Sequence, residues 1–207
     1  MAYYSYVVRR DFGFAPNPFG QYCTIATCKQ EIRQRAKVGD WIFGTGSKEY
    51  KRFQHLIFIM RVSEVIDFQR YWEDSRFIYK KPIMNGSMVG MYGDNIYHLK
   101  KESDEWLQED SHHSYDGGRL NLKNLNRDLS GRNVLISDHF VYLGRRSFLL
   151  PDKYRINICK DGPGYKKDVI DPNLAAELIS EVIEKYGLGL KALPNQMTIC
   201  FKRYDGK

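Results

Sequence analysis

The hydrophobic and polar positions along the chain predict mainly short strands with a few helices. Residues 3–8 are aromatic or β-branched at every position except Ser5, which predicts a strand buried on both faces. Residues 41–43 and 56–66 predict two further strands that pair as a hairpin. We expect the first of these to break at residues 44–47, because two glycines interrupt the run there.

The second half of the chain contains the clearest helical pattern. Residues 133–137, 140–143 and 197–201 are apolar enough to predict strands. Between them, residues 172–186 carry apolar side chains at helical period, and Gly187 follows as a stop signal. A chain that mixes strands and helices in this order is expected to form an α+β fold.

A basic helix and an apolar loop are predicted near the amino terminus. Residues 24–37 predict a helix on which Lys29, Arg33 and Lys37 share one face at i, i+4 and i+8. Residues 11–23 contain two prolines and two glycines, so they predict an irregular loop. Its phenylalanines make it unusually apolar for a solvent-exposed loop. We expect them either to pack against the core or to contact a ligand.

The middle of the chain has the weakest pattern. Residues 68–81 predict a short helix that runs into an irregular connection. Residues 85–130 are rich in glycine and asparagine and predict mostly loop around short strands such as 95–98. A loop region of this length inside a compact domain is often functional.

Composition narrows the class of protein. The 207 residues are 43% hydrophobic and 14% aromatic, which is too high for a disordered chain, and their mean hydropathy of -0.53 argues against a membrane span. No apolar run is long enough to cross a membrane, and the amino terminus does not resemble a signal peptide, so we expect a cytoplasmic protein with no membrane partner. We expect residues 1–207 to form one domain that includes the helix and strand at about 172–204. The oligomeric state stays open.

The charge indicates an anionic partner. A formal net charge of +7 favours nucleic acid or a nucleotide, although a merely solvated basic surface would look similar. The cysteines lack the CxxC spacing of a zinc site, so we expect buried free thiols and predict neither a metal nor a cofactor: Cys23, Cys28, Cys159 and Cys200.

Two segments could carry chemistry. Residues 44–48 could bring backbone close to a ligand and donate hydrogen bonds to it, or they could be only a hairpin connection. The loop that contains His112, His113 and Asp116 holds residue types suited to general acid–base catalysis. Adjacent histidines in a strand would point to opposite faces, which argues against one shared metal ion. No Ser/His/Asp arrangement can be read from the sequence.

Several strings resemble a known family. They are YSYVVRRDFGFAPNPFGQYCTIATCKQEIR, VGDWIFGTGSK, MRVSEVIDFQRYWEDSRF, NVLISDHFVYLG and the HHSYDGG segment, and they extend over roughly the first three quarters of the chain. The chain resembles the second nucleotide-modification-associated domain family, which occurs in phage and bacterial gene sets linked to DNA base hypermodification. The resemblance implies a role in making, reading or processing modified bases, in a modification or defence setting. It transfers no catalytic residue.

A second likeness concerns the fold. The helix, the VGDWIFGTGS string and the following strand are similar to the core hairpin of PUA-like domains, some of which hold a modified base in a pocket. This likeness implies an α+β, PUA-like, partly open β-barrel with flanking helices. Its pocket would be lined by a set of stacking and polar residues: Asn17, Phe19, Trp41, Gly44, Thr45, Gly46, Ser47 and His113.

The leading functional hypothesis is recognition of a modified base or nucleotide, with DNA favoured over RNA. Lys29, Arg33 and Lys48 would hold the phosphate. One alternative is an enzyme that acts on a modified base or its glycosidic bond, with His112 and Asp116 as acid and base. Another is a binder of free nucleotides.

Overall fold

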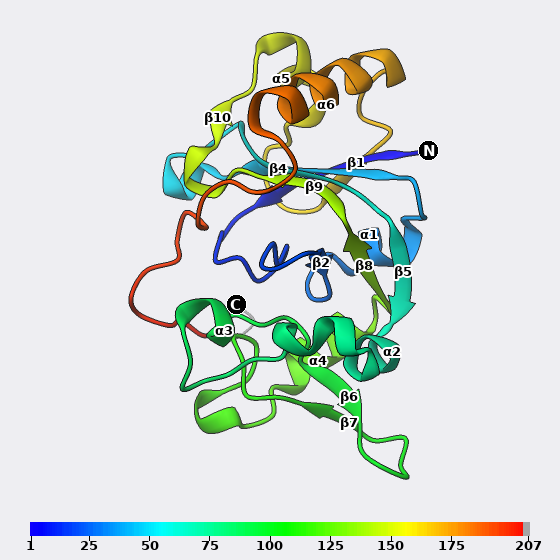
Figure 1. Cartoon of the computed structure of the whole chain (residues 1–207), viewed down its shortest axis with the longest axis vertical. Coiled ribbons are helices and arrows are strands. Elements are labelled where there is room, and N and C mark those ends of the chain that lie inside the picture. The colour runs from blue at the N-terminus through cyan, green and yellow to red at the C-terminus, as the bar shows by residue number, and fades with distance from the viewer. Residues whose placement is uncertain (205–207) are drawn as a thin grey trace.

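A seven-stranded mixed sheet and two helices form one half of the protein (Figure 1). The structure is a computed structural model that describes residues 1–204. Helices α5 and α6 lie on one face of the sheet, with bounds Asp152–Ile158 and Pro172–Tyr186. The strand order is β11 (Tyr165–Lys167), β1 (Tyr3–Val8), β3 (Trp41–Gly46), β4 (His55–Arg61), β9 (His139–Tyr142) and β12 (Gly189–Leu190), with β10 (Phe148–Leu149) also paired to β4.

Strand β1 is buried on both faces, as the sequence predicts. Tyr3 packs in the cluster beneath α5 and α6, whereas Tyr4 and Tyr6 point into the cluster on the opposite face of the sheet. Ser5, the polar exception, is also buried and donates its hydroxyl hydrogen to the Ile158 carbonyl of α5 at 2.6 Å. The alternation of side chains along the strand therefore fixes two hydrophobic layers at once.

The predicted hairpin is confirmed, but the predicted break in its first strand is wrong. Strand β3 continues through Gly44 to Gly46 and pairs antiparallel with β4. Gly44 makes room for a neighbouring ring, because a Cβ atom there would lie 2.0 Å from the Phe58 side chain. The second predicted strand divides into β4 and β5 (Glu64–Asp67), which belong to different sheets.

The other half of the protein is built on a three-stranded sheet and a hairpin. Strands β2 (Cys23–Ile25) and β5 flank β8 (Asn133–Ser137) in one sheet, and β6 (Tyr97–Leu99) pairs with β7 (Trp106–Gln108). Its α-helices are α1 (Gln30–Arg35), α2 (Phe68–Glu73), α3 (Met88–Met91) and α4 (Leu122–Leu129). Short 3-10 turns occur at Lys48–Tyr50, Ser75–Lys80, Asp116–Gly118 and Gly144–Arg146.

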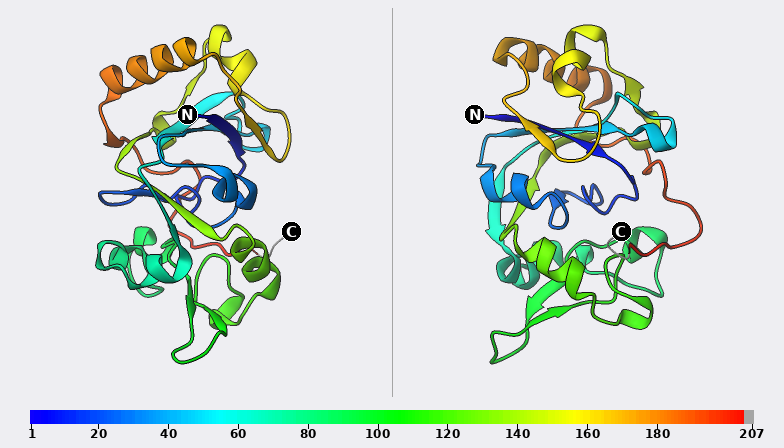
Figure 2. Two further views of the ribbon diagram at one scale, coloured as in Figure 1. Left: turned by 90° about the vertical axis from the view of Figure 1, so that its right-hand side faces the viewer. Right: turned by 180° about the vertical axis from the view of Figure 1, so that it is seen from behind.

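Three further predictions need correction. The basic helix begins only at Gln30, because residues 23–25 pair with β8 as a strand. Residues 85–130, predicted as loop, also contain α3 and α4. No strand forms at 197–201; there the chain crosses to the other half of the molecule (Figure 2). Helices α2 and α6 and strands β8 and β9 lie where they are predicted.

The α+β class is confirmed, whereas the PUA-like barrel is not. The large sheet ends in β11 on one side and β12 on the other, and within residues 1–204 no hydrogen bonds join these two edges into a closed barrel. Helices α5 and α6 cover its outer face, and α1 and β2 pack against its inner face. None of the helices in this range is long and apolar enough to cross a membrane.

The packing of Gly44 against Phe58 gives a test of the fold. Gly44→Ala should lower the free energy of unfolding by about 1–3 kcal/mol, because the added methyl group overlaps a buried ring. Urea unfolding measures the change. Gly90→Ala is the matched control. Gly90 lies in α3, and a Cβ atom there would meet its nearest neighbour at an ordinary contact distance of 3.7 Å. Equal stability of both variants and the natural protein would contradict this assignment of Gly44.

Candidate functional site

A cavity of about 400 Å³ opens where β1 leaves the large sheet. Its wall combines the end of β1, the turn before α1, the loop after β7 and the carboxy-terminal segment. Aromatic rings make up much of this wall: Tyr6, Phe12, Phe14, Tyr165 and Tyr204. Among residues 1–204, one carboxylate, Glu31, and four arginine or lysine side chains also line it: Arg9, Arg10, Lys29 and Arg127.

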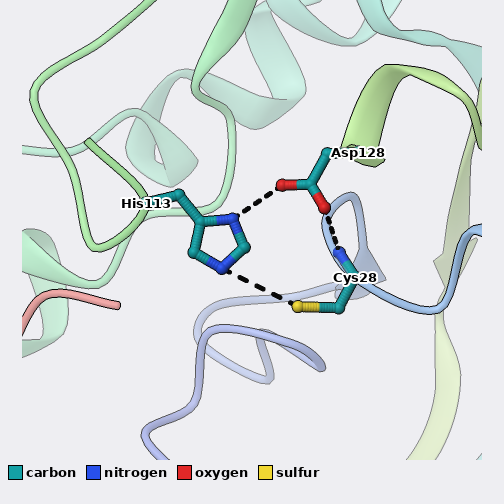
Figure 3. A group of neighbouring side chains, drawn as sticks. All are labelled: Cys28, His113 and Asp128. Atoms are coloured by element: carbon teal, nitrogen blue, oxygen red, sulfur yellow. Dashed lines mark hydrogen bonds and ion pairs between the residues drawn. The ribbon is translucent and has the colours of Figure 1, made fainter. Parts of the chain in front are cut away.

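Cys28 and His113 line this cavity, and buried Asp128 lies behind His113. Figure 3 shows the three side chains. Cys28 lies in the turn before α1, His113 in the loop after β7, and Asp128 in the last turn of α4. Cys28 Sγ lies 3.8 Å from His113 Nε2, and His113 Nδ1 lies 2.6 Å from Asp128 Oδ2. The imidazole therefore sits between a thiol and a carboxylate, the order found in nucleophilic enzymes.

Asp128 is fully buried, and its carboxylate accepts hydrogen bonds from Cys28, His113 and Tyr97. Its Oδ1 accepts the Cys28 backbone N–H at 2.8 Å, and its Oδ2 also accepts the Tyr97 hydroxyl at 2.9 Å. Burial alone would raise the pKa of Asp128, but the charge and hydrogen bond of His113, the charge of Arg33 and the Cys28 N–H together outweigh burial and lower that pKa. The carboxylate therefore remains ionised and orients both the thiol segment and the imidazole.

The two adjacent histidines have opposite protonation. Burial alone would lower the pKa of His113, but Asp128 and Cys28 outweigh burial and raise it to about 9. Burial, followed by the charge of His113, lowers the pKa of His112 to about 3. His113 is thus an imidazolium at neutral pH, whereas His112 is neutral and bonds through Nδ1 with the Lys202 carbonyl.

Buried Arg33 holds the segments of the site together. Its guanidinium donates to the backbone carbonyls of Cys28 at 2.7 Å, Asp128 at 2.5 Å and Asn133 at 2.8 Å. Gly131 leaves space for it, because a Cβ atom there would lie 2.5 Å from the guanidinium. One side chain therefore joins the turn before α1, the end of α4 and the start of β8.

The geometry of the three side chains favours a proton relay over a metal site. Cys28 faces one nitrogen of the His113 ring and Asp128 faces the other (Figure 3). An ion bound by Sγ and Nε2 would lie across the ring from the carboxylate oxygen that bonds Nδ1. Asp128 is also committed to three hydrogen bonds, so an ion on the cavity side would have only two protein ligands from this group.

Three of the predicted site residues line the cavity. His112 and His113 lie on its floor, and their rings stack 5.5 Å apart instead of pointing to opposite faces. Lys29 lies at the wall, with Nζ 4.4 Å from the centre of the Tyr6 ring. Burial lowers the pKa of the Lys29 amine.

The glycine-containing segment 44–47 does not line the cavity. The hydroxyls of Thr45 and Ser47 donate to backbone carbonyls of β1 and of the residues just after it, at 3.4 and 3.2 Å. Gly44 lies beneath the Phe58 ring, and a Cβ at Gly46 would lie 2.2 Å from a backbone oxygen. These four residues pack strands together.

The other residues predicted to contact a base are buried elsewhere. Asn17 accepts a hydrogen bond from buried Lys80 at 2.7 Å, and Phe19 belongs to the hydrophobic core of the same half of the protein. Trp41 packs edge-on to His139 on the far face of the large sheet. None of the three lines the cavity.

The remaining predicted residues also have other partners. Lys48 pairs with Asp161 at 2.6 Å on the surface. Arg33 is fully buried, and its guanidinium bonds to the three backbone carbonyls named above. Asp116 is exposed and pairs with Arg203 at 3.0 Å. The expected cationic stripe of the basic helix therefore does not form one surface.

Cys28 and Asp128 are the residues that sequence reasoning missed as a site. The sequence held a weak signal for the helix that carries Asp128, because Asn121 is a residue type that favours a helix start. It caps α4 by accepting the Asn124 backbone N–H at 3.1 Å. Nothing in the sequence indicates that Cys28 meets His113, which lies 85 residues away. The cysteines are free thiols, as predicted, but only Cys23 is fully buried: Cys28 and Cys159 are half-buried and Cys200 is exposed.

The opposite protonation of the two histidines can be measured directly. Nitrogen-15 NMR of the histidine rings should show His113 protonated and His112 neutral throughout the range from about pH 5 to about pH 8. His113→Gln and His112→Gln assign the signals. Two ordinary titrations near the reference pKa of about 6.5 would contradict the arrangement.

The same shifts fix opposite effects on stability. The folded pKa of His113 lies above its unfolded value, so its stabilising contribution is complete below about pH 6.5 and is lost as the pH rises through about 9. The folded pKa of His112 lies below its unfolded value, so its contribution is present above about pH 6.5 and is lost as the pH falls toward 3.

Comparison with known proteins identifies the family. The profile of nucleotide modification associated domain 2 matches residues 1–201, nearly the whole chain. No curated protein and no solved structure matches it. The match includes the whole of the β1, Cys28, His113 and Asp128 segments. The chain therefore belongs to the nucleotide modification associated domain 2 family.

Proposed function

We propose that the cavity beside Cys28 recognises a modified base or its nucleotide. The observation that carries the proposal is its wall, which over residues 1–204 combines five tyrosine or phenylalanine rings with four arginine or lysine side chains and one carboxylate. Its volume of about 400 Å³ is in the size range of small-molecule sites, roughly 300–1,000 Å³. Membership of a family associated with nucleotide modification supports the same class of ligand.

The base would stack among the rings at the cavity mouth. Tyr204 is the best platform, because the guanidinium of Arg10 lies 5.1 Å and that of Arg127 lies 5.2 Å from its ring centre. A base on this ring would therefore lie beside two donors suited to phosphate oxygens. This pose assigns to Tyr204 the stacking role first expected of Phe19 or Trp41.

The ligand can be part of a polymer or free. Half-buried Arg10 and Arg127 suit one or two phosphates, which a free nucleotide supplies as well as a DNA strand does. We propose DNA as the polymer and a phage or bacterial modification or defence pathway in the cytoplasm as the setting, on the strength of the family. A polymer reader would lose affinity steeply with added salt, whereas a free-nucleotide binder would show a shallow dependence.

The cationic residues of the cavity provide the test. Arg10→Ala and Arg127→Ala should each weaken binding of nucleoside monophosphates by about tenfold, because a hydrogen bond to a charged group contributes about 1.5–3 kcal/mol. Calorimetric titration with modified and unmodified nucleotides, and with short DNA that carries them, measures the affinity.

Arg146→Ala is the matched control, since Arg146 is exposed and does not line the cavity. Its affinity should equal that of the natural protein. An equal loss in all three variants would mean that only general charge attracts the ligand, and would reject the proposed site.

A further inference from the structure

We infer that Cys28, His113 and Asp128 form a catalytic relay for acyl transfer, with Cys28 Sγ as the covalent nucleophile. The substrate class is a nucleotide that carries an amide or ester group, and this second part rests on the proposed function. The inference starts from the distances along the relay, 3.8 Å from Sγ to Nε2 and 2.6 Å from Nδ1 to the Asp128 carboxylate. They place a nucleophile, a base and an orienting group in the order that thiol activation uses, with Sγ and Nε2 within the longer hydrogen-bond range of sulfur.

Only one of the four cysteines has this environment. Burial raises the pKa of Cys23 to about 12 and that of Cys159 to about 11, so neither forms a thiolate readily. Cys200 is exposed, and its thiol makes none of the hydrogen bonds described over residues 1–204. Cys28 alone combines a cavity wall with an imidazole.

The backbone around Cys28 is held in an unusual conformation. Cys28 and Lys29 adopt positive φ values of 54° and 39°, which side chains other than glycine seldom adopt. Such strain persists only where the surroundings determine it, and here the Asp128 carboxylate binds the Cys28 N–H while Arg33 binds its carbonyl. Both polar groups of the Cys28 backbone are therefore fixed, which aims Sγ at His113.

The relay supplies every proton that acyl transfer needs. In the reacting form of the relay, His113 Nε2 holds the proton of the Cys28 thiol, and the thiolate attacks the acyl carbon, forming a C–S bond as the carbonyl π electrons move to oxygen. Collapse of this adduct breaks the C–N or C–O bond, and His113 Nε2 gives its proton to the leaving group. Water then loses a proton to Nε2 and attacks the thioester, which releases a carboxylic acid and restores the thiol. No oxidant or reductant is required.

The placement of the acid favours acyl transfer over cleavage of a glycosidic bond. In acyl transfer the nucleophile and the leaving group occupy one tetrahedral carbon, so an imidazole beside Sγ can serve both. In-line displacement at a sugar carbon requires a second acid on the far side of the ring, several ångströms away. Within residues 1–204, Glu31 is the one carboxylic acid that lines the cavity, and its side chain is exposed.

Alkylation of the intact chain tests the relay without any knowledge of the substrate. Neutral iodoacetamide should modify Cys28 at neutral pH at least about tenfold faster than Cys200 of the same molecule, because the thiolate is the reactive form. Peptide mass spectrometry follows both sites. His113→Gln should remove the advantage of Cys28 and leave Cys200 unchanged. Equal rates at the two cysteines of the natural chain overturn the inference, and this comparison needs no variant.

Covalent turnover is the second measurement. With 4-nitrophenyl acetate, the natural protein should release a burst of nitrophenol and gain one acetyl group on Cys28, and Cys28→Ser should not. Asp128→Asn should slow acylation while the thiol remains present, provided that circular dichroism shows the fold intact. If Zn²⁺ alone binds tightly at one equivalent through Cys28, and no acetyl-enzyme forms, the group is a metal site and the inference fails.

Protection by nucleotides separates this inference from the proposed function. Nucleoside monophosphates should slow iodoacetamide at Cys28 if the cavity binds them. Fast alkylation and acetylation without protection would support the relay and reject the nucleotide site. Protection without enhanced alkylation or acetylation would support the nucleotide site and reject the relay. Release of acid from an N-acetylated cytidine monophosphate would support both.

Discussion

The structure of the site depends on satisfying one buried carboxylate. Asp128 is fully buried, and an ionised group without partners would be strongly destabilising there. Its oxygens receive hydrogen bonds from the Cys28 backbone, the His113 ring and the Tyr97 hydroxyl, which belong to three separate segments. Arg33 completes the arrangement through the backbone. A buried charge in this position orders the segments around it, because each must be in place to solvate it.

The same physical requirement shapes the apolar loop that forms the cavity wall. Buried Lys80 donates to both the backbone and the side-chain oxygen of Asn17 and to the Tyr22 carbonyl, and burial lowers the pKa of its amine to about 8. These bonds satisfy loop oxygens, while Asn17 and Thr24 also pair through their backbones. In this loop Phe12 and Phe14 lie against His112 as part of the cavity wall.

The net charge of the chain overstates what a ligand would meet. Lys48 and Arg9 form surface ion pairs with Asp161 and Glu49, which weakens their pull on an anion. Arg33 is buried and donates its hydrogen bonds to backbone carbonyls, so its charge does not reach a ligand. The cations left at the cavity are few and lie beside aromatic rings and a potential nucleophile. This small cluster of cations and rings suits one anionic aromatic group better than it suits a long stretch of nucleic-acid backbone.

The sequence by itself determined the elements whose side-chain period reports burial directly. Strand β1 and helix α6 can be predicted from local pattern, because the spacing of apolar side chains along each element shows which of its faces are buried. The family could also be identified from contiguous motifs. Helix α4 could not, since its residues are mostly polar, and it is stable in part because Asp128 and Asn124 bond to distant segments. The meeting of Cys28, His113 and Asp128 was decided only by the tertiary structure. Contacts across 85 and 100 residues depend on how the sheets stack, and no local spacing encodes them.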